Sequence, residues 1–158
     1  MRYSNFVLNC ACVLAPTLAP TLARADMLDR YRDASVAQAA RMHEFMISRV
    51  PEIEAVLPDT TWTPEMDAVA TCTIDGIRAS RGDNGVEAYV AALEAWSAQD
   101  IRSMGTMADG MDPVLSDSLA LQVAQDCGGM ELAAAQMQNS GMIEMISRPD
   151  VMERLMAE

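Results

Sequence analysis

Two methionines flank the single histidine of the chain and together offer a soft metal site. Met42, His43 and Met46 fall within about one turn of a predicted helix, so their side chains would lie close together. Thioether sulfur and imidazole nitrogen are ligands that suit Cu(I). These three residues are therefore a candidate copper site in a metal-handling protein.

A second group of methionines has the spacing of one helix face. Met104, Met107 and Met111 are separated by three and four residues, and such a flexible, polarizable stripe suits a groove for a protein partner. The chain has 14 methionines but only two tryptophans, three tyrosines and two phenylalanines. Because methionine fills irregular helical cores, core packing is the favoured interpretation of both groups. The partner groove and the copper site remain as alternatives.

Carboxylates are abundant, and no motif selects a catalytic pair among the 23 acidic residues. A glycosidase-like mechanism needs only two carboxyl groups at a suitable distance, so a carboxylate-based hydrolase is a further alternative. Asp109, Asp112 and Asp117 surround a predicted turn, but their spacing is unlike an EF-hand, and we interpret them as helix caps. With no nucleophile elbow or triad pattern, the sequence leans against an enzyme.

Charge and motif content exclude several classes of function. Every basic residue is an arginine, and 11 of them face 23 acidic residues, for a net charge of -12. Such acidity argues against binding to nucleic acid or to anionic lipid. No glycine-rich phosphate loop is present, and the chain after residue 25 lacks a C-x-x-C or haem motif, so we expect no cofactor.

Residues 1–25 have the pattern of a cleaved secretory signal peptide. Arg2 precedes an apolar segment, and Ala23-Arg24-Ala25 has the small-x-small cleavage pattern. Pro16 and Pro20 interrupt the apolar segment, which is also shorter than the ~20 residues of a membrane span. Cleavage removes two arginines and brings the net charge from -12 to -14. We expect a periplasmic or secreted protein with no membrane span in the mature chain.

Two cysteines remain after the predicted cleavage, and each lies in an apolar run with helical spacing. Cys72 and Cys127 should form a disulfide, because exported proteins fold in an oxidising compartment. Closing the loop between them would stabilise the fold by about 4 kcal/mol through lost entropy of the unfolded chain. The rival interpretations are two buried thiols or a metal pair, but the spacing of these cysteines and the distant histidine matches no zinc motif.

Hydrophobic periodicity predicts helices throughout and no strand alternation. The first helix should place one face inward, formed by Leu28, Tyr31, Ser35, Ala39, Met42, Met46 and Val50. Prolines, glycines and capping residues bound six candidate helices, at about 27–50, 64–81, 84–101, 113–127, 130–139 and 147–156. The predicted fold is an all-α bundle of five to six helices, in one domain over 26–158, stapled by one disulfide.

The predicted function is a binding or protein-interaction module. A well-specified core without a catalytic constellation favours a soluble, acidic, exported helical protein whose partner is an unknown protein or small molecule. The two alternatives are the Cu(I)-handling protein and the carboxylate-based hydrolase.

Overall fold

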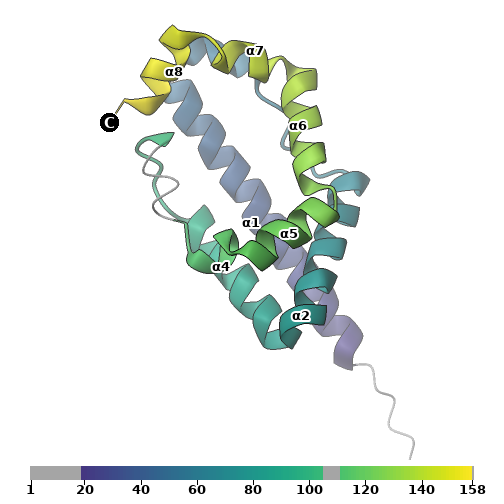
Figure 1. The fold of residues 1–158 in the computed structure, drawn as a ribbon. Coiled ribbons are helices and arrows are strands. Elements are labelled where there is room, and N and C mark those ends of the chain that lie inside the picture. The colour runs from purple at the N-terminus through teal and green to yellow at the C-terminus, as the bar shows by residue number, and fades with distance from the viewer. Residues whose placement is uncertain (1–18, 105–110, 158) are drawn as a thin grey trace, which may run out of the picture.

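The computed structural model describes residues 19–104 and 111–157 (Figure 1). Within these ranges the chain forms seven α-helices and one 3-10 helix, with no strand. The predicted all-α class is therefore confirmed.

The first helix, α1 (Ala19–Arg49), begins earlier than the predicted residue 27. It ends where the sequence indicates, because Val50 precedes a proline and adopts a non-helical conformation, with φ -139° and ψ 79°. The Val50 amide still donates to the Met46 carbonyl at 2.8 Å. Pro51 then opens the 3-10 helix η1 (Pro51–Val56), which lies in the predicted connector.

Helix α2 (Pro64–Ser97) contains both of the next two predicted helices. Thr63 caps its start, since its hydroxyl accepts a hydrogen bond from the Met66 amide at 3.3 Å. Gly82 interrupts the helix with φ 69° and ψ -173°, a conformation open to glycine but not to other residues without strain. Gly82 therefore divides α2 into a first arm (64–81) and a second arm (83–97), which fold back in a V (Figure 1).

The C-terminal third is a series of short helices: α4 (Pro113–Ser116), α5 (Ser118–Asp126), α6 (Gly129–Ser140), α7 (Met142–Ile146) and α8 (Pro149–Met156). Asp112 and Asp117 accept hydrogen bonds from the first-turn amides of α4 and α5, each at 2.8 Å. Asp117 is thus the reason why the predicted helix 113–127 is split in two. Gly128 and Gly141, which flank α6, have φ of 78° and 83°.

The predicted disulfide is present between Cys72 on the first arm of α2 and Cys127 at the end of α5. The two Cα atoms lie 5.7 Å apart, and the bond closes a sequence separation of 55 residues. Close by, Gly76 lets α5 approach α2, because a Cβ at that glycine would lie only 2.7 Å from a methyl carbon of Val123. The disulfide therefore joins two helices that are also in tight contact.

The buried apolar side chains form two separate clusters. The first lies where α1 ends and meets η1 and α8, and it contains Phe45, Met46, Val50, Ile53, Val151 and Leu155. The second joins both arms of α2 to α5 and the beginning of α1, and it contains Ile74, Ile77, Val86, Val90 and Val123. Helix α1 spans both clusters, while α5, α6 and α7 return along it as an arc (Figure 1). Helix α6 contributes no buried residue.

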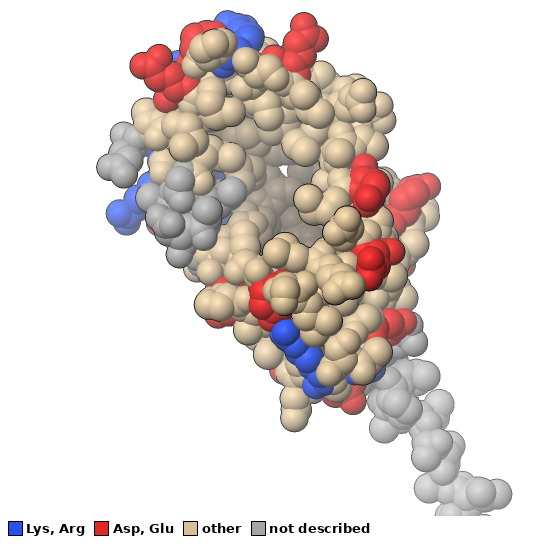
Figure 2. All heavy atoms as spheres, viewed as in Figure 1, with Lys and Arg blue, Asp and Glu red and all other residues tan. Residues whose placement is uncertain are grey.

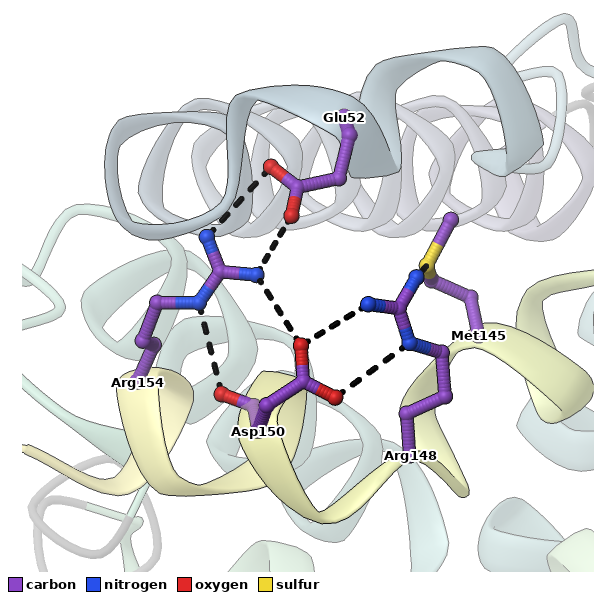
Figure 3. A network of polar contacts seen from close by, with 5 residues as sticks. All are labelled: Glu52, Met145, Arg148, Asp150 and Arg154. Carbon is purple, nitrogen blue, oxygen red and sulfur yellow. Dashed lines mark hydrogen bonds and ion pairs between the residues drawn. The ribbon is translucent and has the colours of Figure 1, made fainter.

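Arginine side chains form ion pairs between the helices that surround these clusters. Arg30 of α1 binds Glu94 on the second arm of α2 through two hydrogen bonds, of 2.8 and 2.7 Å. Arg154 of α8 pairs with Glu52 of η1 and also lies 3.7 Å from an oxygen of Asp150 (Figure 3). Arg148 contacts the same Asp150 carboxylate at 2.8 Å, so the two arginines share one acid. This exposed network holds α8 against η1 beside the first cluster.

Candidate ligand-binding cavity

A cavity of about 240 Å³ lies between α1, the segment 58–62, the start of α2, and the α6–α7 pair. We call it the methionine cavity. It is lined by Ser35, Val36, Ala39, Met42, His43, Met46, Pro58, Asp59, Thr60, Trp62, Met66, Gln136 and Met142. The space-filling view shows a hollow at the centre of the ring of helices, with walls made almost entirely of uncharged residues (Figure 2).

The inward face of α1 forms one wall of the cavity. Four of its residues, at steps of three and four as predicted, line the cavity: Ser35, Ala39, Met42 and Met46. Met46 is also buried in the first core cluster, and Met42 packs against that cluster. Ser35 and Ala39 are small, and the Ser35 hydroxyl donates to the Tyr31 carbonyl of the same helix at 2.8 Å. The small side chains leave room for a guest, and the serine hydroxyl is already satisfied by the backbone.

Four thioethers line the cavity from three different helices. Met42 and Met46 come from α1, Met66 from the first turn of α2, and Met142 from the start of α7. Met46 is only 3% exposed and also belongs to the first core cluster. Unbranched methionine side chains adapt to irregular shapes, so they form an apolar lining that can fit a guest.

His43 is half-buried beside these methionines. Burial lowers the pKa of its imidazole below 6.5, so the ring is neutral at pH 7. A neutral imidazole adds no positive charge to the cavity and keeps one nitrogen lone pair free to accept a proton or bind a metal.

Trp62 contributes an aromatic ring to the lining of the cavity, and residues outside the lining hold this ring in position. Its indole nitrogen donates to Asp67 at 3.1 Å. Its ring meets Tyr31 edge to face, with the centroids 6.5 Å apart, and Tyr31 in turn stacks on Tyr89 at 6.4 Å. The three aromatics connect the cavity wall to the second core cluster, which Tyr31 and Tyr89 border.

A polar pocket of about 410 Å³ adjoins the cavity. The two share Pro58, Asp59 and Gln136. The remaining lining of the polar pocket is Thr61, Thr63, Asn139 and Ser140. The polar pocket, which we call the polar vestibule, therefore adjoins the methionine cavity, and Asp59 lines both.

The structure brings together one of the two predicted methionine groups. Met42, His43 and Met46 all line the methionine cavity. Met104 of the predicted partner groove instead packs against the first core cluster. Met107 lies outside the described residues, and Met111 follows directly after that gap. The partner groove therefore stays a prediction.

Sequence reasoning missed Met66, Met142, Trp62 and Asp59 as partners of the predicted residues. Met66 and Met142 lie 20 and 96 positions away from Met46, and only tertiary structure brings them to one cavity. The sole signal in the sequence was the general abundance of methionine, which does not indicate which residues meet.

The carboxyl groups give the hydrolase prediction no support. In the part of the chain that the structure describes, six carboxyl groups have a clearly displaced pKa, and all six are displaced downward: Glu52, Asp59, Glu65, Glu94, Asp117 and Asp150. A general acid at neutral pH needs the opposite displacement. Nor do three His, Cys, Asp or Glu side chains gather into a metal-binding group within the described ranges.

Comparisons with family models, with curated proteins and with solved structures found no match for this chain. A search of the described helices for length and apolar character found none suited to crossing a bilayer.

Proposed function

We propose that this protein is an exported binding protein that holds a small, mostly apolar molecule in the methionine cavity. The observation that carries the proposal is that Ser35 and Ala39, on the inward face of α1, line a cavity and belong to neither core cluster. Helix faces of this kind are normally buried in folded proteins. A partly open, apolar cavity with a few polar groups is the usual form of a small-molecule site.

The volume of the cavity limits the size of the guest. Apolar cavities of about 150 Å³ accept benzene, and pockets for drug-sized ligands begin near 300 Å³. A cavity of about 240 Å³ therefore suits a molecule with one ring, or a short alkyl chain, and a small substituent.

Sequence features support the setting of this proposal. The predicted signal peptide over residues 1–25 directs the chain to the periplasm or the exterior. The net charge of -12 favours solubility and disfavours nucleic acid as a partner.

A pair of substitutions on adjacent residues of α1 tests the proposal. Ala39 lines the cavity, whereas Ala40 is exposed on the same helix. Ala39→Leu should fill the cavity and weaken binding of 2-phenylethanol at least tenfold, and Ala40→Leu should leave the affinity within twofold. Trp62 is the natural reporter, and Trp96→Phe in every sample removes the only other tryptophan.

Ligand-induced stabilisation provides a second readout. A ligand that binds only the folded state raises the melting temperature as its concentration exceeds its Kd. The rise should occur with the parent and with Ala40→Leu, and be absent with Ala39→Leu. Equal binding by all three proteins, or binding by none across a series of phenyl and short alkyl alcohols, would refute the proposal.

A second candidate function is Cu(I) binding in the same cavity. The observation that favours copper is that four thioethers and one neutral imidazole line the same methionine cavity. The residues that would bind the metal are then Met42, His43 and Met46, as predicted, with Met66 or Met142 as added ligands. Anaerobic titration against a colorimetric Cu(I) chelator decides between the candidates. Tight binding that His43→Phe and Met46→Leu both weaken would favour copper, and equal affinity in these variants would exclude this site.

A further inference from the structure

Asp59 is the single charged side chain in the lining of the methionine cavity and its polar vestibule. No arginine lines either space, and His43 is neutral because burial lowers its pKa. In the described residues, the ion pairs found do not include Asp59. The exposed Asp59 side chain therefore places one negative charge, without an ion pair among the described residues, in the lining that the two spaces share.

The Asp59 carboxylate is held in place by the chain that follows it. Its Oδ1 atom accepts hydrogen bonds from both the amide and the hydroxyl of Thr61, each at 2.8 Å. These bonds lower the pKa of Asp59 below 3.8, so the group is ionised at neutral pH. Neither bond uses Oδ2, which leaves that oxygen with lone pairs for a donor from a guest.

The surroundings of Asp59 select the sign of charge on a guest. An anionic group would meet a carboxylate with no basic partner nearby, which is unfavourable. A cationic group would gain a charge-assisted hydrogen bond at Oδ2, and Trp62 supplies an aromatic ring in the lining of the same cavity. The net charge of -12 would also attract cations to the molecule.

We propose that the guest is a small amphipathic cation, an alkyl- or arylammonium ion whose apolar body fills the methionine cavity and whose charged end pairs with Asp59. This inference rests on the proposed function and gives its ligand a charge class. It assigns Asp59 as the residue that determines specificity.

Three probes that differ only in their polar end test the inference: 2-phenylethylammonium, 2-phenylethanol and 3-phenylpropanoate. Binding is measured at pH 7 through Trp62 fluorescence in the Trp96→Phe background. We expect the ammonium to bind at least tenfold more tightly than the carboxylate, and more tightly than the alcohol. Raising the salt concentration should weaken binding of the ammonium and leave the affinity for the alcohol unchanged.

Asp59→Asn keeps the size of the side chain and an oxygen that can accept from Thr61. It should remove the preference of the parent protein for the ammonium over the alcohol. Glu153→Gln makes the same change in net charge on α8, away from the lining residues, and should leave the preference intact.

The outcomes separate this inference from the function on which it rests. If the alcohol binds and the ammonium binds no more tightly, or if the preference survives in Asp59→Asn, the charge class is wrong and the cavity remains a binding site. If none of the three probes binds, the proposed function fails and the charge class fails with it.

Discussion

The methionine cavity depends on a few small side chains on α1. Ser35 and Ala39 occupy inward positions between the larger Tyr31 and Met42. Because Ser35 donates to its own helix, the cavity wall remains mostly apolar although it contains a serine. A larger apolar residue at either position would fill part of the cavity.

Gly76 is a second place where the absence of a side chain decides the structure. A Cβ there would lie 2.7 Å from a Val123 methyl carbon. Gly76→Ala should therefore destabilise the fold by about 1–2 kcal/mol, because overpacking outweighs the helical preference of alanine. Urea unfolding monitored by circular dichroism measures the effect.

The matched background for this test is Val123→Ala, which removes the methyl groups that Gly76→Ala would strike. There the same substitution should stabilise the fold by about 0.5–1 kcal/mol, since only the helical preference remains. A destabilisation of equal size in both backgrounds would contradict the close approach of α5 to α2.

At the residue scale, the sequence predicted part of the cavity. Helical spacing placed Met42, His43 and Met46 together, because neighbours on one helix need no tertiary information. Met66 and Met142 reach the same space from other helices, which local spacing cannot predict. The role that we propose for Asp59 depends on the lack of arginines in the two linings, and only the folded structure shows which residues form them.

At the scale of elements, the disulfide joins the first arm of α2 to the end of α5. Replacing both Cys72 and Cys127 with alanine should lower the free energy of unfolding by about 4 kcal/mol, given the separation of 55 residues. Urea unfolding of the oxidised protein and of the variant measures the difference.

A reductant provides the control. It should lower the stability of the parent protein by a similar amount and leave the double variant unchanged. Two thiols that react freely in the folded, air-oxidised protein would contradict the bond.

Local chemistry made most helix boundaries predictable. Pro51 and the Thr63 cap act through neighbouring residues, as do the glycines at 128 and 141, and the structure shows each boundary where the sequence indicated. The effect of Gly82 was less predictable, because a positive φ can end a helix or turn it. Here it produces two arms of α2 that both contribute to the second core cluster, the first through Ile77 and the second through Val86.

At the scale of the whole molecule, ion pairs between elements should make stability depend on pH. The hydrogen bonds from Arg30 lower the pKa of Glu94 below 4.5. A lowered pKa in the folded state stabilises the fold above the unfolded-state value, and this contribution disappears as the pH falls through the folded-state value. Glu94→Gln should therefore destabilise the protein at pH 7 by up to about 1 kcal/mol, and by progressively less below pH ~4.

Urea unfolding at pH 7, 5, 4 and 3 measures this difference, with Glu153→Gln as the control. Glu153 is exposed and lies outside the ion pairs found among the described residues, so its substitution should have the same small effect at every pH. A Glu94→Gln effect that does not change with pH would show that the ion pair with Arg30 of α1 makes no electrostatic contribution to stability.

Helix α6 has a consequence for how quickly a guest could depart. Its twelve residues include none that is buried, neither core cluster contains any of them, and the glycines that flank it, Gly128 and Gly141, both have positive φ. A transient detachment of this segment would uncover Gln136 and the cavity beside it while both clusters stay packed. The residence time of a guest would then depend on local detachment of α6, whereas the melting temperature would depend on unfolding of the whole protein. Substitutions at the two glycines could therefore change the residence time without changing the melting temperature.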